Sequence, residues 1–212
     1  MEIDTSNNLL SRTTTNPSKI CFWILAHVLH NPVLLSSVRK EITPTFSHHG
    51  LDIKYLTTQC PLLDATFNEA LRLLTTASSA RNVEAPTTVN GNLLVPPAKI
   101  LIPARQLHYD EEFFGPNTRT FDPYRFLNNK ELQKSPAFKP FGGGLTLCSG
   151  RFVAKAQVLA LAAVVLMRSD WEVVDMEGGV PRLDLTKPTL GVMDPVEGDD
   201  VLLRSRSSDG DA

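Results

Sequence analysis

The stretch Phe141-Gly142-Gly143-Gly144-Leu145-Thr146-Leu147-Cys148-Ser149-Gly150-Arg151 carries most of what can be inferred about this 212-residue chain. Three glycines lead to a single cysteine, and residues 152–167 are almost entirely apolar and contain neither proline nor glycine. This pattern predicts a loop that ends at the start of a buried helix. Unpaired N–H groups and the helix dipole favour a thiolate there, and the thiolate is the form of cysteine that binds metals.

The residues after the glycines argue against two other kinds of site. A phosphate-binding loop is disfavoured because the glycines are not succeeded by a Gly-Lys-Ser/Thr sequence. A structural zinc site is disfavoured because it needs four ligands and the stretch offers one cysteine. An ordinary glycine-rich turn beside a small buried cysteine stays open on composition alone.

The spacing of the stretch favours a haem site. Phe141, Gly144, Cys148 and Gly150 stand in the pattern Phe-x-x-Gly-x-x-x-Cys-x-Gly, which resembles the haem-binding signature of the cytochrome P-450 family. The resemblance implies that Cys148 is the axial thiolate ligand of a haem iron. It also implies that Phe141 packs against the proximal side, that Gly142 and Gly144 belong to the haem-binding loop, and that Gly150 allows a close approach near the sulfur.

One position departs from the family pattern. Family members often carry arginine or histidine two residues before the cysteine, where it meets a haem propionate, and this chain has Thr146. We therefore expect either weaker haem binding or another cation in that role.

Residues 61–74 are predicted to form a helix, because Pro61 suits a helix start and leucines recur at helical spacing. Glu69 and Arg72 share a face of it, and by themselves they predict a surface ion pair worth roughly 0–1 kcal/mol. They also match the Glu-x-x-Arg signature of the family. The resemblance supplies Arg125 as a third member and implies a buried structural network, Glu69, Arg72 and Arg125, that anchors the proximal loop.

Two further residues match positions that meet the haem propionates in the family. Arg81 follows the Glu-x-x-Arg helix, and an exposed arginine at the start of a strand is the equally open alternative. His108 lies after a predicted small sheet, where the matching family residue is more often structural, and a propionate contact is the other candidate role.

A first helix is expected over about Ser18 to His30, and its apolar residues surround the axis, so it should be central. Asn31-Pro32 predicts the start of another helix that ends near Ile42. Asn16 matches the family's distal helix, which usually carries an acid–alcohol pair that this chain lacks. Asn16 is therefore a candidate distal residue, and a helix cap is the alternative.

The remaining segments suggest short β-structure. Asn90-Gly91 predicts a hairpin between residues 87–89 and 93–95, and 100–102 predicts a strand. Residues 43–55 are expected to form a loop. Strands are expected at 171–174 and 190–193, with 201–203 as a candidate third strand.

Charge and cysteine content indicate which partners and which compartment the chain favours. The net charge of −2 favours neither nucleic acid nor an anionic membrane. Three scattered cysteines fit a reducing compartment rather than a disulfide framework. Neither a signal peptide nor a membrane span is evident, whereas members of the family are often found on the endoplasmic reticulum membrane.

The predicted fold is mainly α with small β-sheets and resembles the proximal, C-terminal half of the cytochrome P-450 fold, truncated at its N-terminus. The expected division is a loose segment 1–15, a partial haem domain 16–206 and a polar tail 207–212. Without the rest of such a fold, the segment from Ile20 to Leu29 is expected to lack covering neighbours.

By resemblance, the leading functional hypothesis is haem-thiolate monooxygenase chemistry on a small apolar molecule, with secondary metabolism as a candidate setting and an NAD(P)H-dependent reductase as electron donor. Two alternatives stay open. One is a haem-thiolate isomerase or dehydratase without external electrons, which the absent acid–alcohol pair favours. The other is a non-catalytic remnant or a partner of another chain, so whether the isolated chain is an active enzyme is left undecided.

Overall fold

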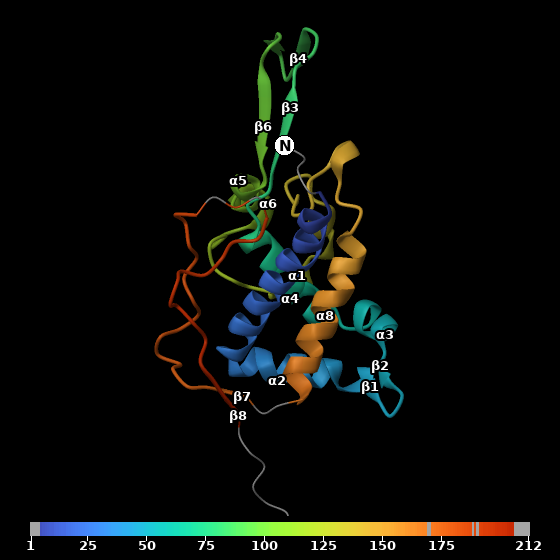
Figure 1. The fold of residues 1–212 in the computed structure, drawn as a ribbon, viewed down its shortest axis with the longest axis vertical. Helices are drawn as coiled ribbons and strands as arrows, with labels where there is room; N and C mark the ends of the chain where they lie inside the picture. The colour runs from blue at the N-terminus through green and yellow to red at the C-terminus, as the bar shows by residue number, and fades with distance from the viewer. Residues whose placement is uncertain (1–4, 169–170, 188, 190, 206–212) are drawn as a thin grey trace, which may run out of the picture.

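The computed structural model describes residues 5–168, 171–187, 189 and 191–205. Helices occupy much of this region, and the expectation of a mainly α fold with small sheets is confirmed (Figure 1). The α-helices are α1 (Thr5–Leu29), α2 (Pro32–Ile42), α3 (Ile53–Thr58), α4 (Pro61–Leu74), α5 (Ala104–His108), α6 (Glu111–Phe114), α7 (Tyr124–Asn128) and α8 (Arg151–Arg168). Short 3-10 helices are η1 (Thr43–Thr45), η2 (Lys130–Lys134) and η3 (Gly144–Thr146).

The strands form small antiparallel pairs rather than one sheet. They are β1 (Phe46–Ser47) with β2 (Gly50–Leu51), β3 (Ser78–Asn82) with β6 (Lys99–Pro103), β4 (Thr87–Val89) with β5 (Asn92–Leu94), and β7 (Trp171–Val173) with β8 (Leu203–Ser205). The β3–β6 ribbon extends away from the helices and carries the β4–β5 hairpin at its tip (Figure 1).

The core lies between α1, α4 and α8, which pack against one another (Figure 1). The expectation that residues 20–29 lack covering neighbours is wrong, because Ile20, Trp23, Ile24 and Val28 are buried in this core. Small residues on α8 permit the close approach: Ala162 and Ala163 are fully buried. Each large apolar side chain buried in this way contributes roughly 1.5–3 kcal/mol.

Helix α4 is the most enclosed element, with almost all its side chains from Leu62 to Leu74 buried. Its predicted bounds are confirmed. Cys60 holds the N-cap position without a side-chain hydrogen bond, and the cap comes instead from Glu41 at the end of α2. The Glu41 carboxylate accepts hydrogen bonds from the N–H groups of Leu62 and Leu63 at 2.7 and 2.8 Å. This long-range cap satisfies N–H groups that the helix itself leaves unpaired.

The N-terminal helix differs from its predicted extent. It begins at Thr5 rather than near Ser18, contains Pro17 in its interior, and crosses the boundary expected at residue 15. Asn16 therefore lies inside the helix and is not its cap. The next helix follows the prediction: Asn31 accepts a hydrogen bond from the Leu34 N–H at 3.0 Å, with Pro32 at the first turn. The tail 207–212 lies outside the described residues.

The predicted β-segments are confirmed in part. Asn90 and Gly91 both have positive φ, 46° and 77°, as the tight turn between β4 and β5 requires. The loop expected over residues 43–55 is wrong, because that region holds η1, the β1–β2 pair and the start of α3. Of the segment 190–193, Leu190 lies outside the described residues, and Val192 forms only an isolated bridge with Thr75.

Within the described part of the chain, no single helix has both the length and the hydrophobicity that spanning a bilayer requires. Residues 15–29 and 32–45 meet these two criteria only when taken together, and they are bent by 116°.

Candidate functional site

The loop around Cys148 is closed on itself by a backbone hydrogen bond. The Cys148 N–H donates to the Phe141 carbonyl at 3.1 Å, which brings the two ends of the glycine-rich stretch together. The turn needs left-handed backbone at Gly142 (φ 76°) and Gly144 (φ 60°), which side chains other than glycine rarely adopt. Phe141 itself packs against the core, so the loop is attached to the helical body at its start.

Cys148 is exposed, and apolar side chains flank it. Leu145 and Leu147 precede it in the loop, and Phe152 and Val153 follow it in the first turn of α8; all four are exposed. Helix α8 starts three residues after the cysteine and becomes buried only from Val158 onward. The predicted loop-to-helix transition is therefore present, but the first helical turn faces outward. We call Leu145, Leu147, Phe152 and Val153 the Cys148 face.

Gly150 approaches the sulfur without crowding it. A β-carbon built at this position lies 3.9 Å from the Cys148 Sγ, which is an ordinary van der Waals contact. The chain by itself therefore has no need of a glycine here. Any such need comes from a group bound at the sulfur.

Glu69 and Arg72 form a buried ion pair, with both side chains fully inaccessible. Arg72 Nε and Nη2 donate to the two Glu69 oxygens at 2.8 and 2.7 Å, a forked geometry that only arginine provides. The Arg125 Nε lies 3.6 Å from Glu69 Oε1, so the three predicted members are brought together. A pair buried this deeply differs from the surface pair that spacing alone favoured.

The same network holds the segment that precedes the cysteine loop. Arg72 Nη1 donates to the carbonyls of His108 and Thr118 at 2.8 and 2.7 Å. The Asp122 N–H donates to Glu69 Oε1 at 3.0 Å. Arg125 donates to the carbonyl of Phe114. These bonds attach residues 108–125 to α4 and leave the guanidinium of Arg72 without a hydrogen bond to solvent.

His108 is fully buried, and both ring nitrogens are engaged by the backbone. Nδ1 lies 3.0 Å from the Arg72 carbonyl, and Nε2 accepts a hydrogen bond from the Lys139 N–H at 3.0 Å. Burial lowers the pKa of His108 to about 4, so the neutral ring is favoured. This geometry corrects the expectation of a propionate contact, since neither ring nitrogen is left for a ligand. The His108 ring links α4 to Lys139, which lies just before the 141–151 loop.

Arg81 lies on the exposed ribbon and reaches the cysteine loop. Its Nη2 donates to the Thr146 hydroxyl at 2.6 Å, across 65 residues of sequence. Thr146 is the position where the family often has a basic residue. The structure therefore brings a cation from β3 to the place where the loop itself lacks one.

Asn16 does not face an open cavity. It contacts Gly191 and Val192, which lie in the segment between β7 and β8 (residues 174–202), called the C-terminal segment below. Its Oδ1 accepts a hydrogen bond from the Val192 N–H at 3.2 Å. A β-carbon built at Gly191 would collide with the Asn16 side chain, so a side chain at 191 requires Asn16 to move. Thr76 holds the same segment through its N–H, which donates to the Gly191 carbonyl at 2.8 Å.

Several of these contacts had no sequence signal. The carbonyls of Thr118 and Thr120 accept from Arg72, and backbone carbonyls carry no residue-type signature. Glu41 and Gly191 were also missed. For Gly191 the residue type was itself a signal, because glycine often occurs where another part of the chain approaches the backbone closely.

Comparison with known proteins identifies the family. The model of the family Cytochrome P450 matches residues 11–198, nearly the whole chain. The chain belongs to the cytochrome P450 family. The cofactor of this family is a haem whose iron is bound by a cysteine thiolate.

Individual relatives agree with this assignment. Cytochrome P450 monooxygenase nodJ of Hypoxylon pulicicidum is 30% identical over 97% of this chain. Abscisic acid 8'-hydroxylase CYP707A1 of Solanum lycopersicum is 30% identical over 77%. The human 7-alpha-hydroxycholest-4-en-3-one 12-alpha-hydroxylase is 27% identical over 87%. The chain spans 43%, 34% and 41% of the lengths of these three relatives.

The described residues fit a haem on the thiol side of this loop. An exposed sulfur lies among exposed apolar side chains, which a flat apolar group would remove from water. The Arg81 cation lies at the edge of the same loop, where an anionic propionate would be paired. Within the described part of the chain there is no cluster of three or more metal-binding side chains, and a haem needs only the one thiolate from the protein.

Proposed function

We propose that this chain carries the haem-thiolate site of a cytochrome P450 monooxygenase, with Cys148 as the iron ligand. The supporting observation is the exposed Cys148 in a loop that its own backbone hydrogen bond closes. The segment before this loop is attached to the buried network of Glu69, Arg72 and Arg125. When bound through a thiolate, haem supplies the activation of O2 for insertion of one oxygen atom into an apolar small molecule.

The residues of the chain have distinct parts in this proposal. The Cys148 thiolate binds the iron, and Gly150 leaves space beside the sulfur. Arg81, oriented by Thr146, pairs with a propionate. Glu69, Arg72 and Arg125 hold the loop in place and do not touch the reacting atoms, because they lie behind it in the core.

The ligand assignment is tested by spectroscopy. The protein is reconstituted with haemin, reduced and exposed to CO, and the Soret band is recorded. We expect the red shift typical of thiolate ligation in the wild type and in a Ser149→Ala control, and its loss in Cys148→Ser. A red shift that survives in Cys148→Ser would refute the assignment.

The reaction class needs a second measurement. We propose that electrons come from an NAD(P)H-dependent reductase in a reducing compartment and that the substrate is a small apolar molecule. Conversion of a candidate substrate only when the reductase is present supports monooxygenase chemistry. Conversion without it supports the isomerase or dehydratase alternative, for which Asn16-Pro17 in the place of the acid–alcohol pair is the supporting observation.

The share of relatives' length that the chain spans favours one more proposal. We infer that the 212 residues alone do not sustain monooxygenase turnover, because the chain covers only 34–43% of the three relatives named in the comparison. Turnover by the chain alone with a reductase would contradict this inference. The inference is supported if the chain alone binds haem without turnover, and turnover appears when the N-terminal part of a relative is co-expressed.

A further inference from the structure

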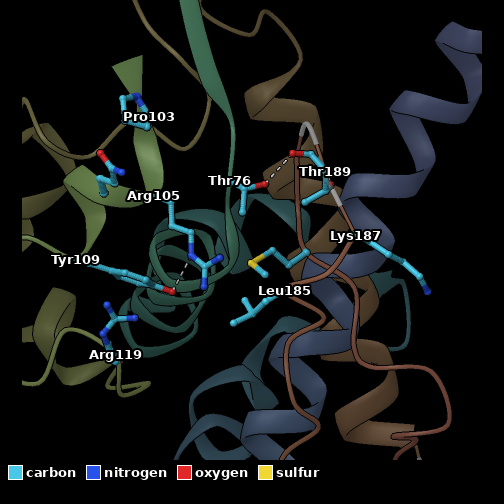
Figure 2. Close-up of a pocket in the computed structure, with 10 residues that line it drawn as sticks. Thr76, Pro103, Arg105, Tyr109, Arg119, Leu185, Lys187 and Thr189 are labelled. Atoms are coloured by element: carbon cyan, nitrogen blue, oxygen red, sulfur yellow. Dashed lines mark hydrogen bonds between the residues drawn. The ribbon is translucent and has the colours of Figure 1, made fainter. Parts of the chain in front are cut away.

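A pocket of about 540 Å³ lies between α5 and the C-terminal segment, and no residue of the 141–151 loop lines it (Figure 2). Its walls come from the base of the β3–β6 ribbon, from Arg105 and Tyr109 at α5, from Arg119, and from Leu185 and Met193. Its volume is within the range of roughly 300–1,000 Å³ that small-molecule sites occupy. The pocket is therefore a site separate from Cys148.

Two arginines share one aromatic ring in this pocket. The guanidinium carbons of Arg105 and Arg119 lie 5.2 and 5.0 Å from the centroid of the Tyr109 ring. Figure 2 shows both side chains beside that ring, with Arg105 reaching toward Leu185. The ring is itself fixed, because its hydroxyl donates to the Leu73 carbonyl at 3.0 Å. The positions of the two cations are thus set by a rigid element.

Neither guanidinium has a carboxylate partner within 4.0 Å among the residues that the structure describes. Arg105 is half-buried, and its hydrogen bond within the described region runs from Nε to the Tyr109 hydroxyl at 3.3 Å. Each guanidinium carries five donors in a planar fork, so most of these donors have no protein partner among the described residues. Two like charges gathered around one ring are stabilised by an anion that binds beside them.

Lys187 differs from the two arginines, although it also lines the pocket. Its Nζ lies 3.4 Å from an Asp184 oxygen, and Figure 2 shows its side chain pointing away from Tyr109. This paired lysine provides a matched control for the two unpaired arginines.

The opposite side of the pocket is apolar. Met193 is buried, and Leu185 is 69% exposed at the surface of the segment that closes the pocket. An exposed leucine next to buried apolar surface gives an aliphatic group a place to bind. A ligand for this pocket thus needs an anionic end and an apolar body.

We propose that the pocket binds a small amphiphilic carboxylate, with the carboxylate beside the guanidinium groups of Arg105 and Arg119 and the aliphatic part against Leu185 and Met193. A carboxylate matches the guanidinium fork in geometry as well as in charge. An inorganic anion would leave the apolar wall uncovered. The site is independent of haem binding and goes beyond the proposed function.

Octanoate titrated into the 212-residue protein and followed by calorimetry tests the proposal, with octan-1-ol as the neutral analogue and acetate as the headgroup alone. We expect saturable octanoate binding, and binding of the other two that is weaker by at least about tenfold. Arg119→Gln should weaken octanoate binding about tenfold, because it removes one charge-assisted contact from an exposed position without disturbing the core. Arg105→Gln should do the same, and Lys187→Gln should leave it unchanged.

The proposal is overturned if octan-1-ol or acetate binds as tightly as octanoate, or if Arg119→Gln and Arg105→Gln bind octanoate like the wild type. It is also overturned if Lys187→Gln weakens binding as much as the arginine variants do. Circular dichroism of each variant establishes that the fold is retained, and exposed Arg119 provides a test that does not depend on the half-buried Arg105.

Discussion

The free-energy cost of burying a charged side chain is offset when an oppositely charged group lies close to it, as Glu69 and Arg72 do. Both side chains are inaccessible, and the arginine also donates to backbone carbonyls of residues 108–120. Removing one partner leaves the other charged, buried and unpaired. The chain also offers an exposed pair of the same spacing, Glu131 and Lys134, for comparison.

We predict that Glu69→Ala lowers the free energy of unfolding by about 3–5 kcal/mol, or prevents folding. Arg72→Lys should retain little of the stabilisation that the pair contributes, because an ammonium group cannot donate the two parallel hydrogen bonds of a guanidinium. Glu131→Ala should change the free energy by no more than about 1 kcal/mol. Urea unfolding measures all three. A soluble, haem-loaded Glu69→Ala protein of near wild-type stability would contradict the structural role.

His108 predicts a dependence of stability on pH. Burial lowers its pKa to about 4 in the folded chain, against an ordinary value of 6.5. The unfolded chain therefore takes up a proton first as the pH falls. The stability that neutral His108 contributes is complete above pH 6.5 and is lost as the pH falls from 6.5 through about 4.

Between pH 7 and pH 5 this loss amounts to about 2 kcal/mol from His108. His27, whose pKa burial also lowers to about 4, adds to it in the same direction. Urea unfolding at the two pH values should show a smaller loss for His108→Gln than for the wild type, by about 2 kcal/mol. Equal losses in the two proteins would exclude His108 as the titrating group.

At the scale of elements, the junction of α1 with the C-terminal segment is closely packed. Asn16 and Trp23 of α1 bond to the backbone of Val192 and Met193, and Lys19 pairs with Asp194 at 2.8 Å. Gly191 is the point of closest approach. The segment has little secondary structure of its own, so these contacts set its position.

We predict that Gly191→Ala destabilises the protein by about 1–3 kcal/mol, because the added methyl group displaces the Asn16 side chain. Asn16→Ala in the same chain should recover part of the loss, which a double-mutant cycle measures. Gly150→Ala is the control, since its β-carbon meets nothing nearer than 3.9 Å. A wild-type unfolding midpoint for Gly191→Ala would show that the junction tolerates a side chain.

At the scale of the whole molecule, the core is closed but the Cys148 face is not. The apolar residues of α1 from Ile20 to Leu29 pack in a core that α4 and α8 share, so the described part of the chain has a continuous core. Leu145, Leu147, Phe152 and Val153 remain exposed. Exposed apolar groups of this kind favour self-association or the binding of an apolar ligand.

We predict that the dye ANS binds this face and that Leu145→Ser with Phe152→Ser lowers its fluorescence by about half. The control pair, Leu93→Ser with Leu101→Ser, removes leucines that are both 66% exposed on the ribbon and should lower it less. Haemin should also lower the emission of the wild type but not that of Cys148→Ser. Equal effects of the two serine pairs would mean that the Cys148 face is not the main apolar surface.

The sequence alone determined the family and the local elements whose causes are local. The spacing of Phe141, Gly144, Cys148 and Gly150 is specific, the helix 61–74 follows from its periodicity, and Asn90-Gly91 sets a turn by backbone preference. Each of these depends on residues that are close together in the chain.

Only the tertiary structure decided what depends on residues far apart. It extended the first helix to Thr5, covered residues 20–29, and placed Asn16 against Gly191. It engaged both nitrogens of His108 with the backbone and brought Arg81 to Thr146. Burial and pairing are properties of contacts between distant segments, and the residue types at 16, 81 and 108 fit several environments equally well. At 16 and 108 the fold selects an environment in which the polar side chain is hydrogen-bonded.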